Sequence, residues 1–235
     1  VGEEVLTMYG SNIYIELGEK MKLLDLVYGL MLRSGNDAAI VIATFIGGTE
    51  ENFVKMMNEK AKKIGMTNTV FNNSHGLDEV TQNKSTAYDM ALLSSYASHN
   101  ETYMKIVGTK KYTVQSDKKS YIWHNRNKLL GSYSYATGGK TGYTPSAGRT
   151  LVTNASHNGL NLTAVTLNDG NEYVSHEMMY DYGFENYKKY TILDRKKFKI
   201  DNAYYPNKIY IKENFSYPLT DVEKENVNVL VKLTN

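Results

Sequence analysis

Residues 23–48 read LLDLVYGLMLRSGNDAAIVIATFIGG, two apolar segments joined by the polar tripeptide Ser34-Gly35-Asn36. Apolar side chains recur at helical spacing in the first segment, and the pattern stops at the tripeptide. A second helix should follow directly, because Asn36 can cap it and Gly47-Gly48 can end it. Its body, residues 38–46, is almost wholly apolar, which predicts a helix buried on all sides. The sequence therefore predicts a polar break between two packed helices.

The rest of the chain is predicted as helices followed by strands. Further helices should begin near Thr49 and at Ser85-Thr86, where residues suited to capping precede apolar residues at helical spacing. After residue 110 the pattern favours strands at 112–114, 121–123, 149–155 and 160–167, a helix at 172–183, and β-like segments at 196–200, 208–211 and 227–233. His157-Asn158-Gly159 is a hairpin signal. This order predicts an α+β protein with one domain at residues 1–190, followed at residues 191–235 by the start of a small β domain.

Composition excludes several classes of protein. The 235 residues are 41% hydrophobic, which excludes a disordered or fibrous chain. The 27 basic and 25 acidic residues include no long basic run, so we expect no nucleic-acid partner. The absence of cysteine and the scattered histidines favour neither a metal nor another cofactor. No apolar run approaches the roughly 18 residues of a membrane span.

Two tripeptides point to a chemistry, Ser34-Gly35-Asn36 and Lys140-Thr141-Gly142. Ser-x-Asn and Lys-Thr-Gly are two of the three signatures of serine acyl-transfer enzymes that bind penicillin. A strand bearing Lys140 and Thr141 can offer an ammonium and a hydroxyl to a carboxylate while its backbone pairs with an extended peptide. Gly142 leaves room for close approach. On the opposite wall, Ser34 can relay a proton and Asn36 can hydrogen-bond a substrate amide.

Other interpretations of these residues stay open. Residues 134–141, SYATGGKT, differ from a phosphate-binding loop only at the first position, but Gly142-Tyr143-Thr144-Pro145 predicts strand and turn where that loop needs a helix. The first tripeptide can simply cap and turn a helix pair. Lys140 can be an edge-strand lysine that opposes aggregation. Two further candidates, Arg126 and His75, can be an ion-pair partner and a loop-shaping residue respectively.

The chain resembles the low-molecular-weight penicillin-binding proteins, which are serine-type D-alanyl-D-alanine carboxypeptidases. The likeness covers residues 5–190 and the β tail more loosely. Besides the two tripeptides it rests on Gly18-Glu19-Lys20, Asn58-Glu59-Lys60-Ala61, His75-Gly76-Leu77, Ser85-Thr86-Ala87-Tyr88-Asp89-Met90, Asn125-Arg126-Asn127, Tyr143-Thr144 and Tyr182-Gly183-Phe184.

This resemblance implies a penicillin-binding/β-lactamase-like fold, an antiparallel sheet with helices on both faces plus a helical subdomain. It implies an enzyme outside the cytoplasm that trims the terminal D-Ala from peptidoglycan stem peptides through an acyl-enzyme, and that β-lactams acylate. Any membrane contact would be through an anchor outside this sequence. The implied catalytic residues are Ser34, Asn36 and Lys140. The implied substrate-binding residues are Thr141 and Gly142 on the strand, Arg126 for the carboxylate, and Tyr143, whose N–H forms half of an oxyanion hole.

The family's third signature, Ser-x-x-Lys, carries the nucleophile and lies upstream of Ser-Gly-Asn in relatives. Here the one match, Ser116-Asp117-Lys118-Lys119, lies downstream in a polar segment that predicts a hairpin loop. We therefore expect this chain to lack its nucleophile. A non-catalytic cell-wall-binding homologue is one alternative. A serine β-lactamase is another, less favoured because the second motif is Ser-Gly-Asn rather than Ser-Asp-Asn.

Overall fold

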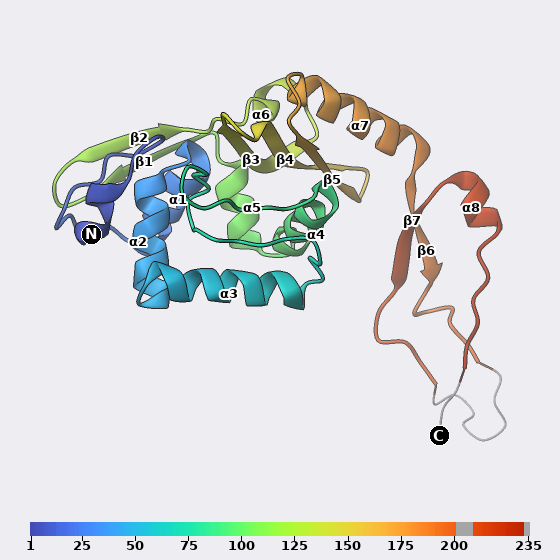
Figure 1. The fold of residues 1–235 in the computed structure, drawn as a ribbon. Coiled ribbons are helices and arrows are strands. Elements are labelled where there is room, and N and C mark those ends of the chain that lie inside the picture. Colours follow the sequence, from blue (N-terminus) through green and yellow to red (C-terminus); the bar gives the residue numbers. More distant parts are fainter. Residues whose placement is uncertain (201–208, 233–235) are drawn as a thin grey trace.

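The computed structural model describes residues 1–200 and 209–232 (Figure 1). Its first half contains η1 Glu3–Thr7, α1 Leu23–Arg33, α2 Asn36–Gly47, α3 Glu50–Lys63, α4 Ala87–Ser98 and α5 Glu101–Gly108. Its second half contains β1 Lys111–Gln115, β2 Ser120–His124, α6 Leu129–Ser132, β3 Ala136–Thr144, β4 Gly148–His157, β5 Leu160–Leu167, α7 Glu172–Asn186, β6 Lys188–Leu193, β7 Phe215–Leu219 and α8 Asp221–Glu225. Within these residues, no helix combines the length and apolarity that crossing a bilayer requires.

The predicted break between two helices is confirmed, with two corrections. Ser34 ends α1 in the left-handed conformation, with φ 59° and ψ 44°. Asn36 is not the cap of α2, because Gly35 takes that position and the Asn36 side chain donates instead to the carbonyl of Tyr9 at 2.8 Å. Burial on all sides is also wrong. The helix is buried only as far as Ala43, and its last turn leaves Phe45 74% exposed.

Strands β3, β4 and β5 form an antiparallel sheet in that order, so β3 lies at one edge. Helices α4 and α5 pack against one face and α7 packs against the other, as predicted. Side chains alternate between the faces, so Lys140 and its partner Val152 point to the side of α4 and α5. The β4–β5 hairpin turns at Asn158 and Gly159, with φ of 50° and 77°, as the hairpin signal indicated.

The largest hydrophobic cluster lies where the β1–β2 hairpin covers α1 and α2. Tyr112 stacks on Tyr28 with ring centroids 3.7 Å apart, and Trp123 packs beside it. The Tyr112 hydroxyl donates to the buried carboxylate of Asp25 at 2.6 Å, which raises the pKa of Tyr112 to about 12. This cluster holds α1 and α2, the two helices that flank the polar break, against the β1–β2 hairpin.

Two parts of the chain differ from the prediction. Helix α5 was not predicted, because its eight residues are too few to show a helical period, although Asn100 caps it by accepting from Tyr103. In the tail, residues 196–200 are not a strand, because the Asp194 carbonyl accepts from Lys197 and Phe198 and so forms a turn.

The other two predicted tail strands are not found either. Residues 209–211 and 227–232 have no regular structure and do not join the antiparallel pair β6–β7, while residues 208 and 233 lie outside the described residues. Strand β6 starts at Lys188, and Figure 1 shows β6, β7 and α8 beyond the end of α7. The domain division at residue 190 stays a prediction.

The face of the sheet under α7 carries a buried polar network. His176 is fully buried, and its Nδ1 lies 2.6 Å from the Thr153 hydroxyl, which in turn contacts the Tyr180 hydroxyl at 2.8 Å. Burial lowers the pKa of His176 to about 4, because the charged form would lose its water without gaining an anionic partner in contact. The neutral imidazole is therefore part of the packing between α7 and the sheet.

This network makes stability depend on acid. Because His176 has a lower pKa folded than unfolded, where about 6.5 is usual, the unfolded chain binds more protons between these values. The free energy of unfolding should therefore fall as pH drops from 6.5 towards 4, by up to about 3 kcal/mol from this residue. Urea unfolding at several pH values should show a smaller decrease for His176→Gln. The exposed His124→Gln is the control, and an unchanged slope in His176→Gln would contradict the assignment.

Candidate active site

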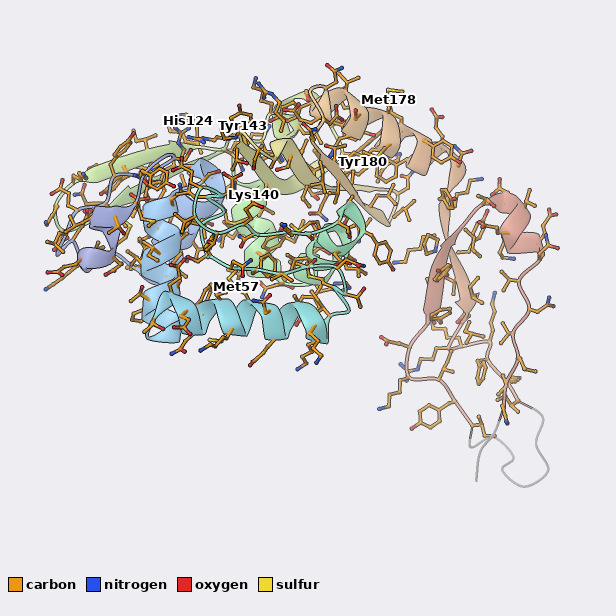
Figure 2. The ribbon with its side chains drawn as sticks, in the orientation of Figure 1. Met57, His124, Lys140, Tyr143, Met178 and Tyr180 are labelled. Atoms are coloured by element: carbon orange, nitrogen blue, oxygen red, sulfur yellow. The ribbon has the colours of Figure 1, made fainter. Side chains whose placement is uncertain are left out.

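All seven predicted site residues line one cleft of about 1120 Å³. They are Ser34, Asn36, Arg126, Lys140, Thr141, Gly142 and Tyr143. The cleft lies between the α1–α2 break, strand β3 and a loop at residues 71–85. Figure 2 shows Lys140 on the helical side of the sheet and Tyr143 beyond its other side, as the alternation along β3 requires. Folding thus brings together two motifs separated by about a hundred residues.

Lys140 joins the two walls of the cleft. Its Nζ donates to Ser34 Oγ at 2.5 Å and to the Thr141 carbonyl at 2.5 Å. Loss of water around the ammonium, and secondly the positive charge of Arg126, lower the pKa of Lys140 to about 8. In roughly a tenth of the molecules the Lys140 amine is then neutral at pH 7. An amine in this state, bonded to a hydroxyl, can both accept and return a proton.

Asn36 is held rigidly beside this pair. It is buried, its backbone N–H donates to the Ser11 carbonyl at 2.7 Å, and its Nδ2 donates to the Tyr9 carbonyl. Within residues 1–200 and 209–232, Oδ1 of Asn36 has no hydrogen-bond partner. This oxygen is therefore available to accept from a substrate amide N–H.

Asp37 holds the break in place. One carboxylate oxygen accepts from the N–H groups of Ile13 and Ala38, at 3.0 and 2.9 Å, and the other accepts from Ile15 at 3.2 Å. The buried carboxylate lies in the first turn of α2, where the helix dipole favours negative charge. It therefore ties the segment containing Ser11 and Ile13 to the helix that begins at Asn36.

Strand β3 offers an unpaired edge to an extended ligand. It pairs only with β4 in the described sheet, and Tyr143 near its end is 70% exposed. Arg126 lies beside it, with its guanidinium donating to Ser11 Oγ at 2.9 Å and its backbone N–H donating to the Leu32 carbonyl. Partial burial, and secondly the charge of Arg33, lower the pKa of Arg126. A carboxylate bound beside Arg126 would relieve the repulsion between Arg126 and Arg33.

The loop at residues 71–85 closes one end of the cleft. Its centre is Asn73, whose buried amide donates to the carbonyls of Leu77 and Thr81. At the tip, Ser146 Oγ donates to Asp78, which tethers the loop to the β3–β4 turn. His75 accepts from the Leu77 N–H at 3.1 Å, and burial lowers its pKa. Of the two interpretations of His75, a site residue or a loop-shaping residue, this hydrogen bond supports the second.

Sequence reasoning missed several residues of the cleft. Tyr9 and Ser11 anchor Asn36 and Arg126, and Tyr173 donates to the Arg126 carbonyl at 3.3 Å. No spacing marks these residues, because their contacts span between 27 and 115 positions in the chain. Only the Tyr-Gly-Ser run at 9–11 gives a local signal, that of a turn.

Ser116 does not reach this site. As predicted, it lies in the turn between β1 and β2, where its Oγ accepts from the N–H groups of Lys118 and Lys119. It does not line the cleft. The part of the cleft that the structure describes therefore contains no Ser-x-x-Lys pair. Nor do residues 1–200 and 209–232 gather three or more His, Asp or Glu side chains suited to a metal ion.

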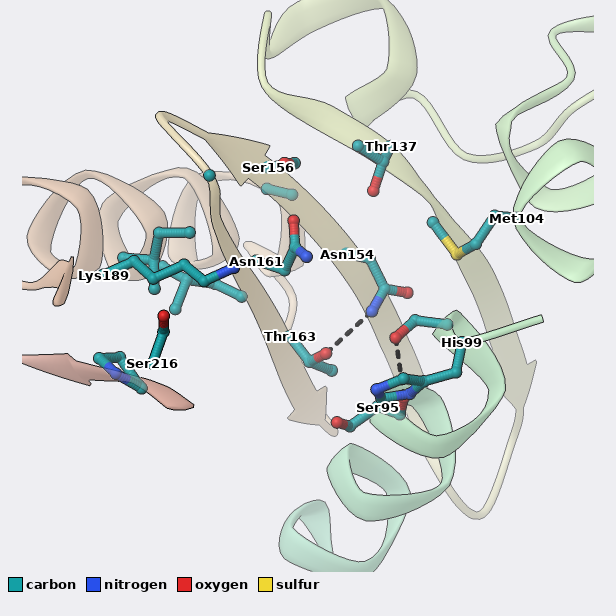
Figure 3. Close-up of a pocket in the computed structure, with 16 residues that line it drawn as sticks. Ser95, His99, Met104, Thr137, Asn154, Ser156, Asn161, Thr163, Lys189 and Ser216 are labelled. Carbon is teal, nitrogen blue, oxygen red and sulfur yellow. Dashed lines mark hydrogen bonds between the residues drawn. The ribbon is translucent and has the colours of Figure 1, made fainter. Parts of the chain in front are cut away.

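A second pocket, of about 470 Å³, lies between the sheet, the end of α4 and the β6–β7 pair (Figure 3). Asn154 and Thr163 line it and are bonded to each other at 2.8 Å. It is on the same face of the sheet as Lys140 but contains none of the predicted site residues. The chemistry indicated by the sequence is confined to the larger cleft.

A Ser-x-Asn helix break facing a Lys-Thr-Gly edge strand defines the penicillin-binding class of serine peptidases. Comparison with known proteins agrees. The chain belongs to the D-alanyl-D-alanine carboxypeptidase family, peptidase family S11, whose pattern matches residues 1–171. This is a family of enzymes.

Individual relatives support the assignment. D-alanyl-D-alanine carboxypeptidase DacF of Bacillus subtilis is 36% identical over 201 residues, which are 83% of this chain and 51% of that protein. DacC of Escherichia coli is 36% identical over 189 residues, which are 77% of this chain and 46% of the relative. The chain thus spans about half the length of these relatives.

Solved structures share the fold. The D-alanyl-D-alanine carboxypeptidase DacD of Francisella tularensis superposes with a TM-score of 0.77 at 26% identity, covering 99% of this chain and 73% of that one. The Streptomyces K15 DD-transpeptidase gives 0.70 at 32% identity, with 75% and 72% covered. The predicted α+β penicillin-binding fold is confirmed.

The role of Asp37 can be tested by stability. In Asp37→Asn one of the three N–H groups faces an amide NH₂ instead of an oxygen, so a buried donor loses its acceptor. We expect the free energy of unfolding to fall by about 2 kcal/mol, measured by urea titration. Glu51→Gln, which alters an exposed i,i+4 ion pair with Lys55, is the control and should cost about 0.3–0.5 kcal/mol. A loss no larger than that of the control would argue against the bracing role.

The electrostatic coupling of Arg126 to Lys140 can be measured directly on this chain. Competitive acetylation as a function of pH, read by peptide mass, should give a midpoint near 8 for Lys140. In Arg126→Gln the midpoint should rise, because a neighbouring positive charge is gone, but stay below the usual 10.5 because burial persists. Arg149→Gln, which removes a cation bound to Glu172, is the comparison. Equal midpoints in the starting chain and Arg126→Gln would refute the coupling.

Proposed function

We propose that the protein containing this sequence is a serine-type D-alanyl-D-alanine carboxypeptidase that removes the terminal D-Ala from peptidoglycan stem peptides. The observation that carries the proposal is the hydrogen bond from Lys140 to Ser34, which places a proton-transfer pair beside the free edge of β3. Its substrate is part of the cell wall, so the proposed location is outside the cytoplasmic membrane, with a contribution to cell shape.

The cleft has a group for each part of such a substrate. An extended peptide can pair with β3, with its terminal carboxylate near Thr141 and Arg126 and an amide N–H donating to Asn36 Oδ1. The Tyr143 N–H supplies one donor for the developing oxyanion. Lys140 and Ser34 move the proton between nucleophile and leaving amine. The nucleophile comes from a Ser-x-x-Lys segment outside this sequence, which also supplies the second oxyanion donor.

The chemistry runs in two steps. The serine oxygen attacks the carbonyl of the penultimate residue and its proton passes into the relay, which returns it to the leaving amine as the peptide bond breaks. Water then attacks the acyl-enzyme and releases the shortened peptide. Penicillin would acylate the same serine oxygen: the β-lactam C–N bond breaks, and its nitrogen takes the proton but stays attached to the acyl group. The resulting penicilloyl ester would make penicillin a covalent inhibitor.

A non-catalytic cell-wall-binding protein is the second candidate. The observation in its favour is that the described part of the cleft has no Ser-x-x-Lys pair, while its peptide-binding edge is intact. The two candidates differ in covalent chemistry alone.

Intact mass after incubation with penicillin separates these candidates. The natural full-length protein should gain one penicilloyl group on a serine of a Ser-x-x-Lys segment and should release D-Ala from a D-Ala-D-Ala peptide. The 235-residue chain alone should gain none, because Ser34 donates and accepts protons but is not the nucleophile. A folded full-length protein without adduct or D-Ala release would establish the non-catalytic candidate, and rapid penicillin turnover would indicate a β-lactamase. A stable adduct on the 235-residue chain would refute our account of the nucleophile.

A further inference from the structure

Gly142 in β3 has a side-chain oxygen where its own side chain would be. It lies directly opposite Thr150 in β4. A Cβ on Gly142 would stand 2.4 Å from Thr150 Oγ1, too close for any real contact. The space over Gly142 is therefore filled by the Thr150 hydroxyl, which a larger residue at position 142 would displace. The glycine of the motif thus lets a group from the neighbouring strand reach across β3.

The hydroxyl points into the cleft. Lys140 and Gly142 share one face of β3, and their partners Val152 and Thr150 share the same face of β4. Thr150 accordingly lines the cleft. The preceding residue, Arg149, points to the other face, where its guanidinium bonds Glu172 of α7 at 3.2 Å. Thr150 is therefore the residue of β4 that faces the same space as Lys140 at this level.

The Thr150 hydroxyl has no partner in the part of the chain that the structure describes. Its Oγ1 makes no hydrogen bond there, whereas the hydroxyl of Thr153, three residues on and on the opposite face, contacts both His176 and Tyr180. A half-buried hydroxyl with no protein partner gains most from a ligand atom that accepts strongly. The charges around it decide which kind of ligand fits. The cleft is lined by four basic residues, Arg126, Lys128, Lys140 and Arg149, and by three acids, of which Glu172 is bound by Arg149, Asp78 accepts from Ser146, and Glu79 lies on the loop at 71–85. An anion is therefore the complementary acceptor.

We propose that Thr150 is a further carboxylate-binding residue, whose hydroxyl reaches across Gly142 and donates to the terminal carboxylate of the substrate. This inference rests on the proposed function and adds a hydroxyl donor from β4 on the face of the sheet that carries Lys140, the face opposite to Thr141. The Thr150 hydroxyl and the Arg126 guanidinium then hold the carboxylate from two separate segments, which fixes its direction as well as its position.

The test compares ligands with and without the carboxylate. In the natural full-length protein, Thr150→Val replaces the hydroxyl by a methyl group of similar size. The acylation rate constant with benzylpenicillin should fall about tenfold, as for loss of a hydrogen bond to a charged group. Benzylpenicillin methyl ester, whose carboxylate is masked, should react at the same rate with both proteins. Thr150→Ser should restore most of the preference for the free acid. Thr113→Val, at an exposed position of β1 outside the cleft, is the matched control.

Each outcome decides a different question. If the natural full-length protein, without substitution, gains no adduct and releases no D-Ala, the proposed function fails, and this inference fails with it. If the starting protein is active and Thr150→Val slows free acid and ester equally, Thr150 has only a structural role and the inference is wrong. If Thr150→Val unfolds, judged by circular dichroism, Thr150→Ser and Thr150→Ala are compared with the two ligands instead. A loss of acid preference in Thr150→Ala but not Thr150→Ser supports the inference, and equal preference in both refutes it.

Discussion

A single buried carboxylate determines the geometry of the helical wall. Asp37 accepts from the N–H groups of Ile13, Ala38 and Ile15, so the N-terminal segment and the start of α2 cannot move apart without leaving polar groups unpaired. Ser34, three residues before Asp37, adopts the left-handed conformation at the end of α1, an unusual backbone for a residue with a side chain. In that conformation the Ser34 hydroxyl accepts the hydrogen bond from Lys140, and the proposed relay depends on this contact.

The sheet supplies the opposite wall and divides its two faces between different tasks. Under α7, His176 and Tyr180 are sealed into the packing with the hydroxyl of Thr153. On the other face, Lys140 and Thr150 keep polar groups directed at the cleft. Because side chains alternate along the strands, the residues that pack against α7 lie on one face of the sheet and those that line the cleft lie on the other. The low pKa of Lys140 is a product of this arrangement, because its ammonium is shielded from water, lies near the charge of Arg126, and contacts no carboxylate among residues 1–200 and 209–232.

Much of the fold followed from local patterns in the sequence. The helix break at Ser34 and the hairpin at Asn158-Gly159 have strong signals of their own, and both were predicted correctly. That the two tripeptides lie in one cleft was predicted from the chemistry they share. No hydrophobic period or residue spacing in the sequence indicates that they are close in space. What escaped prediction depends on contacts across the chain, such as Asn36 turning to Tyr9 instead of capping α2. In the tail, β-forming residues after Asp194 fold into a turn, because side-chain preference is weaker than local hydrogen bonding there.

The stacked aromatic cluster on α1 has an optical consequence. Trp123 is the only tryptophan in the sequence, and it is packed with Tyr112 and Tyr121 in the cluster that covers α1 and α2. Intrinsic tryptophan emission therefore reports the packing of the helical half alone. The three-stranded sheet, which carries Lys140 and Thr150, contributes tyrosine but no indole, so its opening would pass unseen at wavelengths that excite only tryptophan. A fluorescence trace would follow the helical half, whereas a far-ultraviolet dichroism trace of the same sample would follow the backbone of the whole molecule, so a difference between the two traces would reveal opening of the sheet.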